Sequence, residues 1–167
     1  MESILKFGYE KYNTEAIANT DKIRICAYFV VSDFQKDFAV SVRLGTEELL
    51  DEIEKHEDWI LESVIWDANH KVDTNREGLS IILEKAKNNE FDILLMPHCM
   101  VISRSGSKNF DYTVQLYKLD KSIYGITDGI RSFDALVENI HLTPARQKQY
   151  DELKNQSKNN FIVIEHE

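Results

Sequence analysis

The sequence predicts an α/β fold with a mostly parallel sheet of four to five strands and helices on both faces. Apolar, β-branched runs recur along the chain, and stretches of helical length separate them. Strands joined by connections of that length form a parallel sheet that helices cover. A chain of 167 residues, 43% of them hydrophobic, is also long enough for one domain with a substantial core.

Four runs are predicted as strands. The first, IRICAYFVV at 23–31, is continuous, β-branched and aromatic, and it is too short for a buried helix. The others are WILESVIW at 59–66, FDILLM at 91–96, which Pro97 ends, and 122–127, which Asp128 and Gly129 end. The tail FIVIEHE is expected to add an edge strand or to fray.

The predicted helices follow from apolar spacing. Val42, Leu49 and Ile53 share one face, although Gly45 is a point where this helix could bend or break. The clearest helix has Thr74 and Glu77 at capping-box spacing before a stripe of apolar residues at 79, 82, 83 and 86. Further helices are predicted around 110–117, at 131–140, and at 143–156 after Pro144.

These elements divide the chain into three parts. Residues 1–22 are expected to form a polar N-terminal arm with at most one short helix. Residues 23–130 hold the alternating strands and helices, and residues 131–167 form a helical C-terminal extension.

The composition limits the classes of function. A net charge of −9 argues against a stand-alone, high-affinity nucleic-acid binder, because phosphate contacts need clustered cations. No run approaches the roughly 18 apolar residues of a membrane span, and the N-terminus lacks a signal pattern. A soluble, cytoplasmic protein without membrane association is therefore expected.

No metal or cofactor is expected. Cys26 and Cys99 lie in apolar runs, which predicts buried thiols rather than a disulfide. His98 and Cys99 resemble a metal pair in type, but no further ligands are spaced to complete a site.

The candidate site lies beyond the carboxyl ends of the strands, where open α/β sheets bind ligands. Ser32 follows the first strand, Arg76 the second and Arg104 the third, and guanidinium groups pair well with phosphate oxygens. A structural interpretation stays open, in which Ser32 caps a helix and both arginines are solvated. Asp67 is expected to be a surface turn residue, and three aromatic residues are expected in the core or a subunit contact: Trp59, Trp66 and Phe110.

The ordered strings RICAYFVVS, WILESVIWD, TNREGLSIILEKAKNNEFDILL and ISRS resemble the catalytic domain of serine recombinases, from about Arg24 to Ile130. The resemblance implies a serine that attacks a DNA phosphodiester and stays joined to the 5′ phosphate, with arginines stabilising the transition state. By this resemblance Ser32 matches the nucleophile and Arg76 the arginine that opens the second helix. Arg104 matches the last arginine of the family's Asp-Arg-Leu-x-Arg segment.

The sequence departs from the family pattern at three positions. Val30 stands where the family has an arginine two residues before the serine, on the same face of the strand. Met100 and Val101 replace the aspartate and first arginine of the second segment. Since one lost donor costs on the order of a hundredfold in rate, two losses predict a deficit of ~10⁴.

Three functions are compatible with these observations. The first is a catalytically impaired, stand-alone module that forms a homodimer, or a heteromer with another recombinase. Such a module would bind DNA only weakly by itself. It also takes support from the absence of the DNA-reading region expected after the family's catalytic domain. The second is an active serine recombinase, and the third an α/β domain that binds a small phosphate-bearing molecule. The third ranks lowest because the sequence has no glycine-rich phosphate loop.

Overall fold

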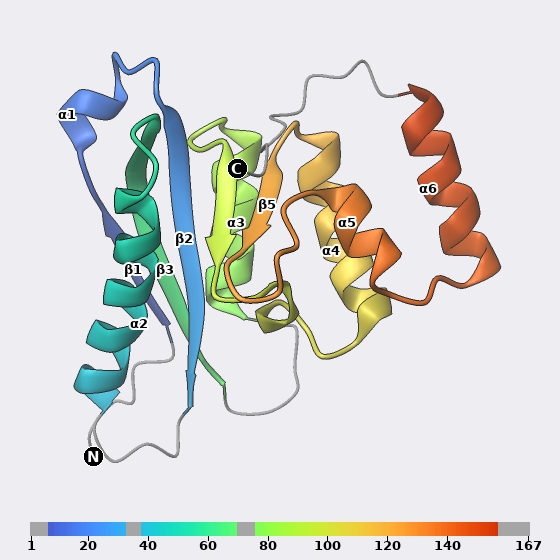
Figure 1. The fold of residues 1–167 in the computed structure, drawn as a ribbon, viewed down its shortest axis with the longest axis horizontal. Helices are drawn as coiled ribbons and strands as arrows, with labels where there is room; N and C mark the ends of the chain where they lie inside the picture. Colours follow the sequence, from blue (N-terminus) through green and yellow to red (C-terminus); the bar gives the residue numbers. More distant parts are fainter. Residues whose placement is uncertain (1–6, 33–37, 70–75, 157–167) are drawn as a thin grey trace.

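A computed structural model describes residues 7–32, 38–69 and 76–156. Five strands form one sheet in the order β1-β3-β2-β4-β5 (Figure 1). Four of them run parallel: β2 (Ile23–Ser32), β3 (Trp59–Asn69), β4 (Ile93–Met96) and β5 (Ser122–Gly125). The strand β1 (Phe7–Lys11) pairs antiparallel with β3 at one edge. The mostly parallel α/β sheet predicted from the sequence is therefore confirmed.

Helices cover both faces of this sheet. On one face lies α2 (Phe38–Glu54), and on the other lie α3 (Glu77–Lys87) and α4 (Gly106–Lys118). The short elements are α1 (Thr14–Ile17), the 3₁₀ turn η1 (Cys99–Val101) and α5 (Phe133–Glu138), and α6 (Pro144–Gln156) is the last described helix. Within the described ranges, no helix is long and apolar enough to cross a membrane.

The strand β2 is buried on both sides, which explains its uninterrupted apolar sequence. Cys26 and Tyr28 pack on the face that α3 covers, whereas Ala27 and Phe29 pack on the face that α2 covers. Side chains alternate between the two faces along a strand, so each layer of helices receives every second residue.

The N-terminal segment differs from the prediction, because it contains the strand β1 as well as the short helix. The residues of β1 are mostly exposed, so their polar pattern gave no sign of a strand. Gly8 allows the close approach of β1 to β3, since a Cβ there would lie 2.1 Å from the Trp66 ring. The tail FIVIEHE lies outside the described residues.

The helix α2 is continuous, so Gly45 does not break it. A Cβ at Gly45 would lie 2.5 Å from the ring of Phe29. The glycine therefore lets α2 pack closely on the sheet, and its role is packing rather than bending.

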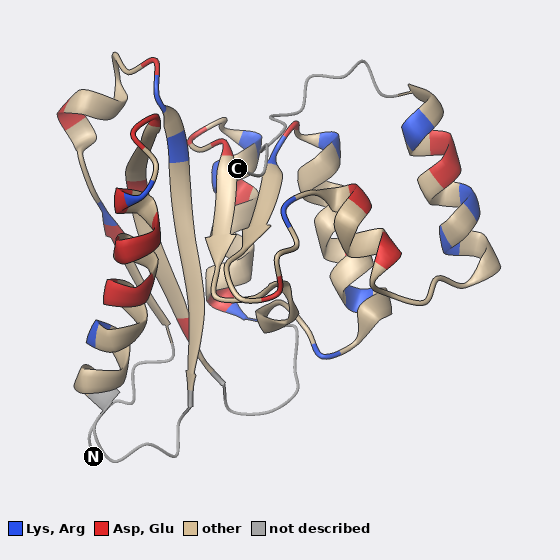
Figure 2. Ribbon diagram, viewed as in Figure 1, with Lys and Arg blue, Asp and Glu red and all other residues tan. Residues whose placement is uncertain are grey.

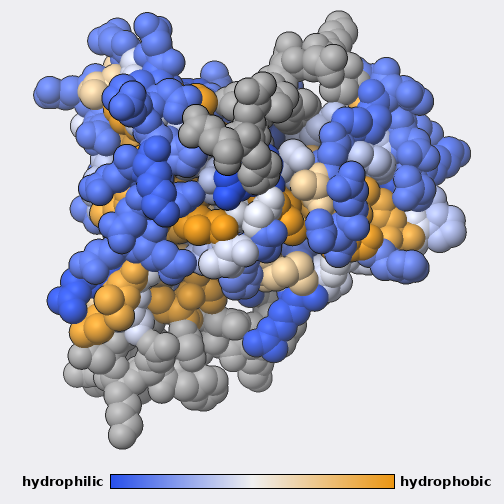
Figure 3. All heavy atoms as spheres, viewed as in Figure 1, coloured by the Kyte–Doolittle hydropathy of each residue, from blue (hydrophilic) through white to orange (hydrophobic). Residues whose placement is uncertain are grey.

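The C-terminal helices pack on the rest of the molecule. A cluster of buried aromatic and aliphatic residues from α4 and α5 receives Tyr150 and Leu153 of α6 at half-buried positions. No residue of α6 is buried, and Figure 3 shows hydrophilic residues over most of this helix. Acidic side chains gather along α2, in keeping with the net charge (Figure 2).

Candidate functional site

Ser32 is the last residue of β2 and pairs with Asn69, the last residue of β3. The strand is thus one residue longer than the predicted 23–31, and Ser32 lies at its carboxyl end. The position of its side chain, like the whole of Asp33, lies outside what the structure describes.

Arg76 stands immediately before α3 and is half-buried. Its Nη1 donates to the main-chain carbonyl of Val101 and lies 3.5 Å from the hydroxyl oxygen of Tyr28. Its Nε is buried and has no hydrogen-bond partner among the described residues. Arg76 thus reaches the carboxyl edge of the sheet, as predicted, but its guanidinium binds groups of the protein.

Asp67 was expected in a surface turn, and that expectation is wrong. The strand β3 continues to Asn69, which places Asp67 inside it with 1% of its surface exposed. Its carboxylate accepts hydrogen bonds from the Tyr28 hydroxyl at 2.7 Å and from the Gly78 amide at 2.9 Å. The sequence favoured a turn for this residue because the predicted strand ended three positions too early, at Trp66 instead of Asn69.

A chain of hydrogen bonds therefore connects Arg76, Tyr28 and Asp67 to the first turn of α3. Burial raises the pKa of Asp67, although the Tyr28 hydroxyl and the Gly78 amide oppose that shift. Burial and the neighbouring Asp67 charge raise the pKa of Tyr28 well above its ordinary value. Tyr28 thus remains a protonated donor, and the carboxyl group of Asp67 is the acceptor of the network.

The capping box predicted for α3 is not the arrangement found. Glu77 is the first helical residue, Arg76 occupies the N-cap without a side-chain hydrogen bond, and Thr74 lies outside the described residues. Asp67 supplies the acceptor for the Gly78 amide instead, from the neighbouring strand. A carboxylate at this end of a helix is favourable because the first amides carry partial positive charge.

The three positions that depart from the family pattern have mainly packing contacts. Val30 and Val101 are half-buried and pack against the core on the α3 face, and Val30 is in register with Asp67. Met100 is 37% exposed, and its sulfur accepts a hydrogen bond from the Asn109 amide. The residue of β3 in register with Val30 is thus Asp67, which carries a carboxyl group.

Arg104 is exposed in the segment between η1 and α4, and no hydrogen bond or ion pair joins it to another described residue. The adjacent serines bond main-chain amides. Ser103 accepts from the Ser105 amide at 3.0 Å, and Ser105 caps α4 by accepting from the Lys108 amide. Of the candidate arginines, Arg104 is therefore the one whose charge faces solvent.

Three other cationic residues of the first strand and the segment after it are paired or lie outside the described residues. Arg24 forms an ion pair with Asp92 at 3.0 Å near the start of β2, too far along the strand to reach Ser32. Arg43 lies 4.0 Å from Glu47 on the exposed side of α2, and Lys36 lies outside the described residues.

Both cysteines are free and buried, as predicted. Burial raises the pKa of Cys26 to about 12, so its thiol stays protonated at neutral pH. Among the described residues, no group of three His, Cys, Asp or Glu side chains is placed to hold a metal ion.

The solved structures similar to this chain include two catalytic domains and one recombinase. The N-terminal catalytic domain of TP901-1 integrase has a TM-score of 0.59 at 15% identity, over 80% of this chain and 97% of that one. A resolvase family site-specific recombinase from Streptococcus pneumoniae has a TM-score of 0.56 at 13% identity, over 81% and 93%. The C-terminal catalytic domain of ISC1926 TnpA, an IS607-like serine recombinase, has a TM-score of 0.54 at 16% identity, over 80% and 98%.

The similarity to these proteins is found by comparing structures. No family model and no curated protein matches the chain. The structural matches cover most of the chain, and they agree with the resemblance found in its motifs. The protein thus has the fold of serine recombinase catalytic domains.

Proposed function

We propose that this protein is a catalytically impaired relative of serine recombinases, linked to site-specific DNA recombination. It acts through association with an active recombinase or with a second copy of itself. The recombinase fold supports the link to recombination. The groups around the end of β2 support the impairment.

The observation that carries this proposal is the binding of Arg76 by protein groups. Its Nη1 donates to the Val101 carbonyl and lies against the Tyr28 hydroxyl, so only part of this guanidinium is left for a phosphate. Preorganised donors contribute to catalysis because they need no rearrangement when charge develops. An arginine that uses some of its donors inside the protein offers fewer of them to the phosphate.

The missing cation at Val30 supports the same proposal. The family resemblance implies an arginine at this position, whereas here a valine side chain is in register with the buried Asp67. Neither side chain can donate the charged hydrogen bonds with which an arginine would stabilise the pentacovalent phosphate. With two arginines absent, cleavage is expected to be slower by ~10⁴ than with the full set.

The test is a search for covalent protein–DNA adducts. The full chain is incubated with a pool of randomised duplex DNA, denatured, and assayed for DNA attached to protein, with Ser32→Ala as the matched control. An active serine recombinase with its own site is the positive control. We expect the wild-type chain and Ser32→Ala to give the same background. An adduct that requires Ser32 would overturn the proposed impairment.

The second candidate function is an active serine recombinase, and Arg104 is the observation that favours it. This exposed arginine follows η1 and is available for a phosphate. The same experiment decides between the two functions. If a Ser32-dependent adduct forms and Arg104→Gln abolishes it, the active enzyme is the correct function.

A further inference from the structure

The outer edge of β1 is open among the described residues, because β1 is the terminal strand of the sheet. Tyr12 donates its amide to the Glu62 carbonyl at 2.9 Å in the register of the β1–β3 pair. Hydrogen-bonded positions alternate along an antiparallel strand, so Gly8 and Glu10 also direct their main-chain groups toward β3. Phe7, Tyr9 and Lys11 therefore direct their N–H and C=O groups outward, ready to pair with another strand.

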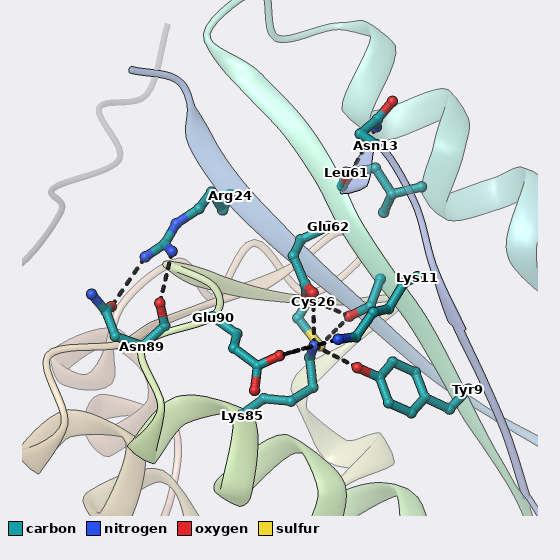
Figure 4. Close-up of polar contacts among 11 residues, drawn as sticks. Tyr9, Lys11, Asn13, Arg24, Cys26, Leu61, Glu62, Lys85, Asn89 and Glu90 are labelled. Carbon is teal, nitrogen blue, oxygen red and sulfur yellow. Dashed lines mark hydrogen bonds and ion pairs between the residues drawn. The ribbon is translucent and has the colours of Figure 1, made fainter. Parts of the chain in front are cut away.

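The side chains of these outward-pairing residues lie on the α3 face. Lys85 of α3 donates to the Tyr9 hydroxyl at 2.9 Å, and the Lys11 ammonium lies 3.8 Å from Glu90 (Figure 4). Ile81 is one helical turn before Lys85, which places it level with Phe7. Phe7 and Tyr9 are 38% and 39% exposed, so an apolar strip follows the open edge.

The strand is held firmly in the position that pairing requires. Tyr9 is bonded to Lys85, whose ammonium forms a buried ion pair with Glu62 of β3 at 2.7 Å. A strand fixed in advance loses little conformational entropy on pairing, and this favours association.

We propose that the outer edge of β1 pairs antiparallel with β1 of a second copy of this chain, joining two sheets into one. Centred on Tyr9, this register sets Phe7 opposite the partner's Lys11, and Gly8 opposite the partner's Glu10. No like charges face each other, and the Lys11 ammonium can lie against the Phe7 ring. The five residues are therefore complementary to themselves under a twofold axis, which identifies the partner as a second copy.

The helices add to this interface. The helix α3 lies against both β1 and β3. When two β1 strands pair, the two copies of α3 would therefore be separated by about two strand spacings, roughly 10 Å. That is an ordinary helix packing distance, so pairing the strands also brings the two α3 helices into contact. The inference rests on the proposed function for its purpose, since it supplies a surface for the association.

Sedimentation equilibrium of the full chain tests the proposal, with Phe7→Lys as the disrupting variant. That substitution places two ammonium groups opposite each other at each end of the pair, and we expect the dimer Kd to rise at least about tenfold. The matched control is Leu44→Lys, which alters another exposed apolar residue, on α2, and should leave the Kd unchanged. Circular dichroism checks that each variant is folded.

The double variant Phe7→Lys with Lys11→Glu tests the register. It places opposite charges across the pair at both ends, so the dimer should return. A wild-type chain that stays monomeric near about 100 μM overturns the proposal, as does a Phe7→Lys dimer of unchanged Kd. Failure of the double variant to restore the dimer overturns the Tyr9-centred pairing. None of these measurements uses DNA, so a monomer that also fails to cleave DNA leaves the proposed impairment and the association with an active recombinase intact.

Discussion

Lys85 shows how a single buried charge organises the N-terminal edge of this protein. Only 3% of its surface is exposed, yet Glu62, Tyr9 and Glu90 all lie within hydrogen-bond distance of its ammonium. Burial by itself lowers the pKa of Lys85, but the hydrogen bonds from its ammonium to Glu62 and Tyr9 outweigh burial and hold the pKa above its ordinary value. The ammonium therefore stays charged and joins α3 to β1 and β3.

Replacing Lys85 with methionine tests this role. Lys85→Met leaves Glu62 buried without its cation, and we expect the free energy of unfolding to fall by roughly 3 kcal/mol. Lys87→Met, on the same helix but at an exposed side chain, should change it by less than about 0.5 kcal/mol. Urea unfolding followed by circular dichroism measures both. An equal decrease in the free energy of unfolding in both variants would show that the buried ion pair stabilises the fold no more than the exposed Lys87 does.

The candidate site could be predicted from the sequence only in part. Ser32 and Arg76 were placed correctly because each follows a strand whose apolar pattern is clear, and parallel strands bring such positions to one edge. The role of Asp67 could not be predicted in the same way, since it depends on a hydroxyl 39 residues earlier in the chain. The hydrogen bond from Arg76 to a main-chain carbonyl is also invisible in the sequence, because any residue at 101 offers one.

At the scale of elements, the start of α3 depends on a close approach between helix and strand. A Cβ at Gly78 would lie 2.5 Å from an Asp67 carboxylate oxygen and 2.9 Å from Ile65. The glycine therefore lets the helix N-terminus approach near enough for its amide to bond the carboxylate. Any larger residue must push α3 away from the sheet.

Gly78→Ala tests this approach. Helix propensity alone favours alanine, but the steric conflict should dominate and lower the free energy of unfolding by about 2 kcal/mol. The control is Ser80→Ala, at an exposed position of the same helix, with an expected change within about 0.5 kcal/mol. Chemical denaturation compares the two. A Gly78→Ala protein as stable as the wild type would mean that α3 tolerates a wider spacing.

The elements themselves were largely predictable, because the buried strands and amphipathic helices carry clear periodicity. The exception is β1, where Gly8 and Glu10 interrupt any apolar pattern and the pairing partner lies more than fifty residues away in β3. The strand exists because the edge of β3 needs hydrogen-bond partners, and this requirement is set by the sheet and not by the local sequence.

At the scale of the whole molecule, three carboxylates connect elements distant in the sequence. Glu52 binds Tyr124, Asp92 binds Arg24, and Asp134 binds both Tyr150 and Lys154. In each case burial acts to raise the pKa, but hydrogen bonds and neighbouring cations outweigh it and lower the pKa. These contacts hold α2, the central strands and α6 together.

This pattern predicts acid sensitivity. A carboxylate whose pKa is lower in the folded state stabilises the fold above its unfolded pKa of about 4, and that stability is lost as the pH falls through the folded pKa. Asp67 has the opposite sign, because its raised pKa makes the folded state gain stability as its carboxylate is protonated. With three groups against one, we expect the free energy of unfolding to decrease below about pH 4.

Urea unfolding between pH 7 and pH 3 measures this dependence. Asp92→Asn should flatten the acid branch because one of the three carboxylates no longer titrates. Asp51→Asn, at an exposed residue of α2, should keep the wild-type profile. A wild-type free energy that stays constant down to pH 3 would contradict the prediction.

The bond between Arg76 and the Val101 carbonyl has a consequence for attempts to revive the chemistry. Introducing arginines at 30 and 101 would return the missing side chains, but the oxygen that holds Arg76 belongs to the peptide backbone and survives every substitution at 101. Variants with those two arginines would therefore still have one Arg76 nitrogen bound to the turn at 99–101. Engineering by point changes alone is expected to yield better phosphate binding long before it yields a nuclease.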